Sequence, residues 1–267
     1  MRKSVEVKNK NKKKPLGKHK KKILRVLVYI VLVVFMLSLL FLIGYSIYYF
    51  STSSKYNISK IVLKNNNIYD TQMLIETSKV SIGTNLYRLS KKEVASNLEE
   101  LPYIESVSIK KIRPDTVEIT VKEYVSKYFA YNEEKDIYIR LTGSGRILEQ
   151  VDAEAKNDIE LLVFGISFDD NISLKTYIAK TEIEKLKLYE KTRKIYDKVQ
   201  IPKEITNIEF KDTNLILTLN HDVNVILNDE DLDYDINFLK SILEKIEGKA
   251  GIIDMTKENP VFTESIR

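Results

Sequence analysis

The residues that most often carry chemistry are few in this chain, and they are far apart. Its 267 residues include no cysteine and only two histidines, His19 and His221. The lack of cysteine excludes a disulfide framework, thiolate metal ligands and thiol catalysis. His19 belongs to a Lys-rich N-terminal segment and His221 to an expected turn. The sequence therefore predicts neither a His-supported catalytic triad nor a His-based zinc site.

A run of acidic residues near the C-terminus suggests calcium binding at first sight: Asp229, Glu230, Asp231, Asp233 and Asp235. The run lacks the glycine and the terminal glutamate of an EF-hand loop. It precedes a helical apolar pattern, and negative charge is favourable at a helix N-terminus. We interpret it as helix N-terminal charge. Because no P-loop or Gly-rich dinucleotide motif is present either, we predict no enzyme, no cofactor and no metal site.

The formal net charge of +5 hides a strong asymmetry. Residues 1–25 contain twelve basic side chains and one acid, Glu6, and so carry +11, whereas the rest of the chain carries −6. This split indicates a basic tail on a mildly acidic protein. DNA binding by the tail is an alternative, but the tail has no aromatic residue. Attraction to an anionic membrane, about 1 kcal/mol per basic side chain, is the favoured explanation, and we expect no nucleic-acid partner.

A single apolar segment follows the tail. Residues 26–50 (VLVYIVLVVFMLSLLFLIGYSIYYF) contain no charged side chain. As a helix they would extend roughly 37 Å, more than the roughly 30 Å of a bilayer's hydrocarbon core. A cleavable signal peptide is disfavoured, because its apolar region is about 7 to 15 residues long and is followed by a small-residue cleavage site. The segment predicts a transmembrane helix.

The residues that flank this segment predict its orientation in the lipid bilayer. Basic side chains crowd one end: Lys20, Lys21, Lys22 and Arg25. Tyrosines, which favour the membrane interface, crowd the other: Tyr45, Tyr48 and Tyr49. The positive-inside rule then places residues 1–25 in the cytoplasm and everything after about residue 50 outside.

Residues 56–124 are predicted to form a compact α+β domain. The pattern predicts a strand at 58–64, a helix at 71–78 capped by Asp70, and a helix opened by the capping box Ser90 and Glu93. Two strands follow at 104–112 and 116–125, joined by a tight turn at residues 113–115. The order is strand, helix, helix, strand, strand.

The sequence from 101 to 124, LPYIESVSIKKIRPDTVEITVKEY, resembles the POTRA domain of the FtsQ/DivIB family of bacterial cell-division proteins. The matching positions are Pro102, Ile104, Ile109, Lys111, Arg113, Pro114, Val117, Ile119, Val121 and Glu123. Each also has a structural explanation: the apolar residues fill a half-buried hairpin, Pro114 shapes the turn, and Glu123 is a solvated edge charge. A basic tail and a single anchor occur in the same family.

A second outer domain is predicted for residues 125–255, followed by a short tail at 256–267. The pattern predicts a hairpin (137–141 and 146–151), an apolar run (159–166), a helix (175–196), three strands (205–210, 215–219 and 223–227), an amphipathic helix from 232, and a last strand (252–255). This order resembles the β-rich second domain of the family. The predicted fold class is thus one transmembrane helix, a POTRA domain, and a mixed β-rich domain with two helices.

The resemblance implies a non-catalytic bitopic scaffold at the division septum. It would dock division proteins of the FtsL and DivIC/FtsB type and help control septal peptidoglycan synthesis. The alternative is a membrane-tethered extracytoplasmic enzyme or cell-wall-binding module. We expect docking by strand addition at the last strand, if it lies at a sheet edge, with apolar help from the residues beyond it. The candidate residues are Ile252, Ile253, Asp254, Met255, Val261 and Phe262, which could instead complete the domain core.

Overall fold

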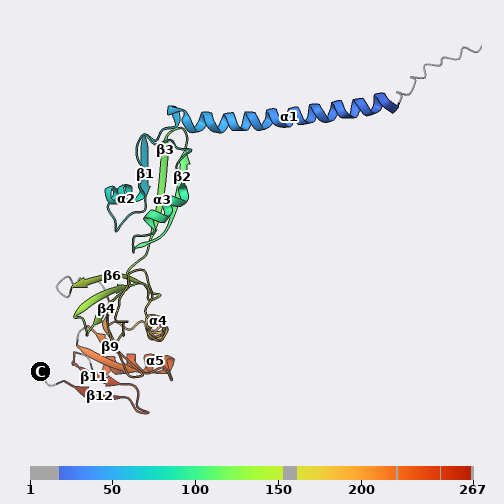
Figure 1. Ribbon diagram of the computed structural model, residues 1–267. Helices are drawn as coiled ribbons and strands as arrows, with labels where there is room; N and C mark the ends of the chain where they lie inside the picture. The colour runs from blue at the N-terminus through green and yellow to red at the C-terminus, as the bar shows by residue number, and fades with distance from the viewer. Residues whose placement is uncertain (1–17, 153–160, 221, 247, 266–267) are drawn as a thin grey trace, which may run out of the picture. The chain divides into compact units, whose positions relative to one another are not determined.

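The computed structural model describes residues 18–152, 161–220, 222–246 and 248–265 (Figure 1). The chain divides into two compact units. The first contains residues 18–61, 81–89 and 111–117 of the described chain, and the second contains the remainder. Most of the predicted basic tail and His221 lie outside the described residues, as do the side chains of His19, Lys20 and Lys21.

The first unit begins with one long helix, α1 (Lys18–Thr52), followed by a single 3-10 turn, η1 (Ser54–Tyr56). The part from Lys22 to Thr52 is long and apolar enough to cross a membrane, and none of its most apolar window is buried by protein. A core helix of a soluble domain would bury one face. An apolar helix that is exposed on all sides therefore fits a transmembrane segment, and it contains the predicted span 26–50.

The predicted order of strand, helix, helix, strand, strand is confirmed between residues 60 and 123. The elements are β1 (Lys60–Lys64), α2 (Thr71–Ser78), α3 (Lys91–Leu98), β2 (Ile104–Ile112) and β3 (Thr116–Glu123). The strands form one sheet in the order β1-β3-β2. Alternate residues of β3 are buried (Val117, Ile119 and Val121), as expected for a strand with one covered face.

Glu123, at the end of β3, is more than a solvated edge charge. Its carboxylate accepts hydrogen bonds from the backbone N–H groups of Asn67 (2.8 Å), Ile68 (3.1 Å) and Tyr69 (3.4 Å). These donors lie in the loop that leads into α2, where no strand supplies an acceptor. Glu123 therefore fixes this loop, which explains why a carboxylate ends the POTRA-like pattern.

The second unit also contains a nine-stranded mixed sheet in the order β12-β11-β10-β9-β8-β7-β4-β5-β6. The strands are β4 (Tyr128–Asn132), β5 (Ile137–Leu141), β6 (Ile147–Asp152), β7 (Leu161–Phe164), β8 (Ile205–Lys211), β9 (Asn214–Leu219), β10 (Val223–Leu227), β11 (Gly251–Asp254) and β12 (Val261–Glu264). Three neighbouring pairs, β4/β7, β7/β8 and β10/β11, are parallel. The predicted mixed β-rich domain is confirmed.

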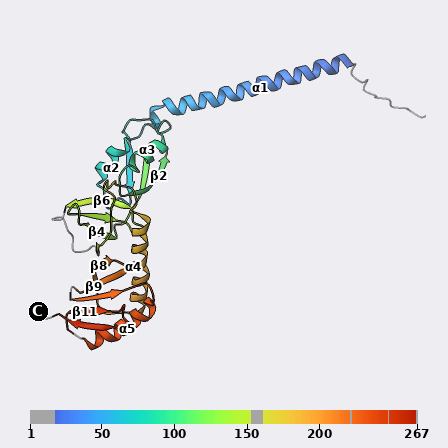
Figure 2. The same cartoon turned by 60° about the horizontal axis from the view of Figure 1, so that its bottom comes forward.

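Two helices, α4 (Lys180–Val199) and α5 (Leu232–Lys245), lie on one side of this sheet (Figures 1 and 2). Their apolar stripes join the strands in one core. The predicted start of the first helix at 175 is wrong. The N–H of Lys175 donates to the carbonyl of Ile147 (2.9 Å) and that of Ile178 to Gly145 (3.0 Å), so this segment runs beside β6 before α4 begins.

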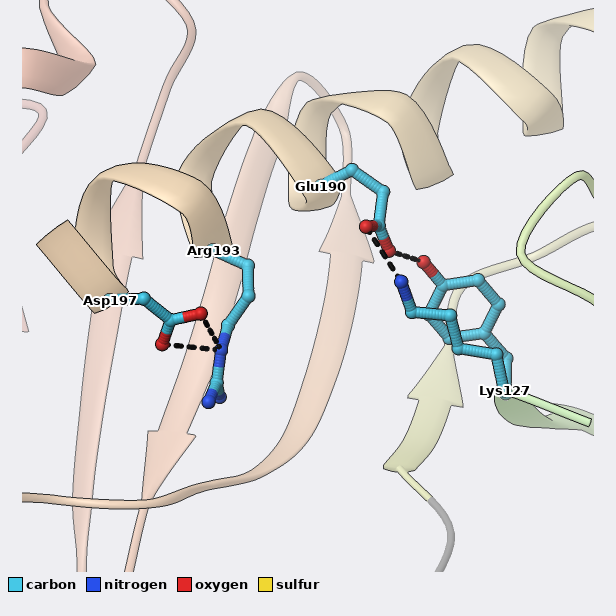
Figure 3. Close-up of polar contacts among 5 residues, drawn as sticks. Lys127, Glu190, Arg193 and Asp197 are labelled. Atoms are coloured by element: carbon cyan, nitrogen blue, oxygen red, sulfur yellow. Dashed lines mark hydrogen bonds and ion pairs between the residues drawn. The ribbon is translucent and has the colours of Figure 1, made fainter.

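Polar contacts connect α4 to the start of β4 (Figure 3). The carboxylate of Glu190 accepts a hydrogen bond from the Tyr128 hydroxyl and forms an ion pair with Lys127 (2.7 Å). Burial, reinforced by Glu190, raises the pKa of the Tyr128 hydroxyl well above its ordinary value. The tyrosine therefore stays protonated and donates. One turn along, Arg193 pairs with Asp197 (2.9 Å).

We predict that Glu123→Ala lowers the free energy of unfolding of the detergent-solubilised chain by about 1–2 kcal/mol, because it leaves three backbone donors without their acceptor. Thermal unfolding measures the change. The control is Glu105→Ala, which removes only an exposed ion pair with Lys122, and its effect should stay below about 1 kcal/mol. Equal effects of the two substitutions would contradict the assigned role of Glu123.

Candidate partner-docking edge

The C-terminal end of the sheet differs from the prediction. β11 is paired on both sides, parallel to β10 and antiparallel to β12, so it is not an edge strand and the condition for strand addition at residues 252–255 is not met. Asp254 explains the reversal of the chain: its carboxylate accepts hydrogen bonds from the N–H (3.0 Å) and hydroxyl (2.6 Å) of Thr256. The segment expected to be a short tail then folds back as β12, the edge strand of the described sheet.

The six candidate residues divide between two faces of the sheet. Ile253 and Met255 are buried in the core, and Phe262 packs against it from β12. For these three the alternative interpretation, that they complete the core, is correct. Ile252 (42% exposed) and Val261 (50% exposed) lie on the opposite face, which also carries the half-buried Asp254. Of the six side chains, only those on this outer face remain available to a partner.

The backbone of β12 presents hydrogen-bonding groups outward at alternate residues. The N–H of Ser265 donates to the carbonyl of Ala250 (2.9 Å), whereas the N–H of Gly251 donates to Asp222 beside β10 (3.1 Å). In an antiparallel ladder, alternate residues direct both backbone groups to the same side. Residues 261, 263 and 265 therefore face β11. The N–H and C=O groups of Phe262 and Glu264 point away from the sheet, where the described chain provides no further strand.

Gly251 permits the close approach of β12. A Cβ atom at this position would lie 2.3 Å from the carbonyl oxygen of Thr263 and 2.8 Å from the Phe262 ring. Any side chain would therefore push the edge strand away. From the sequence alone, Gly251 is predicted only to end the preceding helix. Its role in packing against β12 cannot be predicted from a local pattern, because Phe262 and Thr263 lie more than ten residues further along the chain.

The other residues singled out in the sequence are spread along the chain. The Arg113 guanidinium lies over the Tyr87 ring, 5.7 Å from its centroid, and Pro114 follows it in the exposed turn between β2 and β3. Pro102 is half-buried in the turn before β2. Lys22 and Arg25 are exposed on α1. These residues do not converge on one site.

The acidic run lies at the start of α5, as the helix-charge interpretation predicts. Asp231 is the N-cap residue, and Asp233 and Asp235 belong to the first turn. Burial, with a contribution from Asp231, raises the pKa of Asp235. Among the described residues, no group of three or more His, Cys, Asp and Glu side chains is placed to hold a metal ion.

A cleft of about 1190 Å³ in the second unit was not indicated by the sequence. Three of its polar side chains are linked: the Tyr103 hydroxyl donates to Glu149 (2.8 Å), which also pairs with Arg140 (2.8 Å). Burial and this hydrogen bond raise the pKa of Tyr103. The protonated Tyr103 phenol and the paired Glu149 carboxylate therefore connect β6 to the turn before β2 within this cleft.

We predict that Gly251→Ala displaces β12 while leaving the rest of the sheet folded. Amide hydrogen exchange at residues 261–264 should become faster, because the added methyl group cannot fit against Thr263. Ile252→Ala is the control, since it changes an exposed side chain on the same strand. Unchanged exchange in the Gly251 variant would show that the close approach is not required.

Comparison with known proteins connects this architecture to one family. Residues 56–124 match the family described as "POTRA domain, FtsQ-type". The chain is 29% identical to cell division protein DivIB of Clostridium tetani over 77% of its length and 78% of that protein. It is 27% identical to DivIB of Clostridium acetobutylicum over 78% of its length and 83% of that protein.

Two further comparisons cover different shares of the chain. Identity to DivIB of Clostridium botulinum strain Hall is 26%, over 92% of this chain and 94% of the relative. The solved extracytoplasmic domain of DivIB from Geobacillus stearothermophilus aligns with 47% of this chain and 96% of its own, at 12% identity and a TM-score of 0.29. The FtsQ-type POTRA match and the similarity to several DivIB proteins over most of the chain support placing the chain in the FtsQ/DivIB family of bacterial cell-division proteins.

Proposed function

We propose that this protein is a non-catalytic, bitopic scaffold of the division machinery, which docks partners by strand addition at β12. The observation that carries the proposal is the outward N–H and C=O groups of Phe262 and Glu264 at the end of the sheet. Cell division is the role named for the relatives, and an open strand edge is a recognised way to bind an extended segment.

The chemistry of the edge defines what a partner must supply. Backbone hydrogen bonds would give affinity without regard to sequence, whereas side chains that alternate along the added strand would give specificity. Val261, half-exposed beside this edge, offers one apolar contact on the outer face. Glu264 and Lys249, an exposed ion pair at 2.8 Å, border the edge and would add little affinity.

The partners we propose are single-pass division proteins of the FtsL and DivIC/FtsB type. In this arrangement the N-terminal tail is cytoplasmic, the two outer domains are extracytoplasmic, and the protein concentrates at the septum. Capture of these partners would act indirectly on septal peptidoglycan synthases. α1 supports this topology, since it holds the chain in the membrane in which such partners are anchored.

The test uses proline, which removes one N–H and little else at an edge strand. We predict that Glu264→Pro reduces co-purification of such a partner with the full chain by roughly tenfold or more. Glu264→Ala removes the same carboxylate but keeps the outward N–H, so it should retain the partner. Thermal unfolding checks that both variants are folded. Normal capture by the proline variant would contradict docking at β12.

The same preparations address the alternative of a membrane-tethered wall-binding module. Purified peptidoglycan replaces the division partner in the pull-down. Retention of the protein by peptidoglycan alone, equal in the Glu264→Pro and Glu264→Ala variants, would favour wall binding over the scaffold.

A further inference from the structure

The outer part of the chain contains a second charge asymmetry. Residues after 50 carry −6 in total, yet the outer segments that belong to the first unit, 53–61, 81–89 and 111–117, carry +4. Their five basic side chains are Lys55, Lys60, Arg88, Lys111 and Arg113, against one acid, Asp115. All other residues after 50 together carry −10. Positive charge is therefore concentrated in the segments that group with α1.

These segments contact the C-terminal end of α1 directly. The side-chain amide of Asn85 donates to the backbone carbonyls of Phe50 (3.2 Å) and Ser53 (3.1 Å). The rings of Phe50, Tyr56 and Tyr87 form a cluster with centroids 5.1–5.4 Å apart. Because α1 is the membrane-spanning helix, these contacts hold the basic segments at the level where that helix leaves the bilayer.

Three of the five basic side chains are not neutralised by an acidic side chain. Lys55, Lys60 and Arg88 form no ion pair with any acidic side chain in the described part of the chain. Asp115 is engaged elsewhere, since its carboxylate accepts hydrogen bonds from the hydroxyls of Ser59 and Thr116. Cations next to a membrane surface that lack an acidic partner are attracted to anionic lipid headgroups.

An apolar groove of about 510 Å³ begins at the same place and follows α1 into the membrane-spanning region. It is lined by Leu39, Leu42, Ile43, Ser46, Ile47, Phe50, Ser51 and Tyr87. The helix residues recur at intervals of three and four, so they share one face of α1. Tyr87 closes the groove at its outer end, where Arg113 lies over the ring at 5.7 Å. An apolar groove with cations at one end is complementary to a phospholipid, which has apolar acyl chains and a phosphate at one end.

We propose that the end of the first unit next to α1 is a binding surface for anionic phospholipid. Lys55, Arg88 and Arg113 attract the headgroup phosphate, and one acyl chain lies along the groove between Leu39 and Tyr87. The exposed Ile82 (61%), in the turn before Asn85, adds an apolar contact with the same leaflet. This binding fixes the segments 81–89 and 111–117 against the membrane and is independent of docking at β12.

A soluble polyanion is the competing occupant. It would use the cations but not the groove, because a hydrophilic chain gains nothing from an apolar lining. Most of the groove runs along the membrane-spanning part of α1, so it lies within the hydrocarbon core of the bilayer, where lipid acyl chains surround the helix. The combination of charge and groove therefore favours a lipid.

The experiment uses the full chain in nanodiscs of phosphatidylcholine, with or without phosphatidylglycerol, and measures amide hydrogen exchange at residues 81–89 and 111–117. We expect exchange to slow several-fold when phosphatidylglycerol is present. The double variant Lys55→Glu/Arg88→Glu should lose this difference. The control Lys198→Glu/Lys211→Glu reverses two exposed charges of the second unit and should keep it.

Thermal unfolding confirms that both double variants are folded, and native mass spectrometry counts the anionic lipids retained by each. Equal exchange in the two lipid compositions, or an equal response of both double variants, would overturn the proposal. Inorganic polyphosphate added to phosphatidylcholine nanodiscs tests the competing occupant. If it reproduces the full protection, the surface binds soluble polyanions and the lipid proposal is wrong.

Discussion

Burial of the apolar face of α5 is the constraint on which the C-terminal architecture depends. Leu232, Ile236 and Leu239 are fully buried in the core of the second unit, and each such side chain contributes about 1.5–3 kcal/mol. Because α5 packs on the sheet, the chain returns as β11 parallel to β10, which a short turn could not achieve. β11 then lies inside the sheet, and the reversal at Asp254 makes β12 the edge.

The two proposed surfaces use different physics because they meet different environments. The β12 edge offers backbone groups in water to a protein segment, so its specificity depends on register and alternate side chains. The surface next to α1 combines cations with an apolar groove, which suits a lipid. The charge distribution agrees with this division. The residues after 50 that lie outside the first unit carry a net charge of −10, which suits docking of a protein in water. The segments 53–61, 81–89 and 111–117 carry +4, which suits an anionic membrane surface.

Local patterns predicted elements that depend on local interactions. The helix at 71–78 and the strand at 104–112 have the expected bounds, because capping residues and alternation act within a few positions. No local pattern predicts β4, because four of its five residues are buried and no alternation between buried and exposed positions remains. The predicted start of α4 at residue 175 differs from the observed start because residues 175 and 178 donate backbone hydrogen bonds to residues 147 and 145, contacts that helix propensity does not encode.

The sequence by itself determined the membrane span, through its composition, and the POTRA-type order of elements, through the spacing of its residues, and its resemblance to FtsQ/DivIB proteins indicated the family. Only the tertiary structure decided which residues can meet a partner. Ile253 is buried and Val261 is exposed because β12 folds back on β11, which depends on the carboxylate of Asp254 and the missing side chain of Gly251. The identity of an edge strand is a property of the whole sheet, since it is fixed by which strand has no further neighbour.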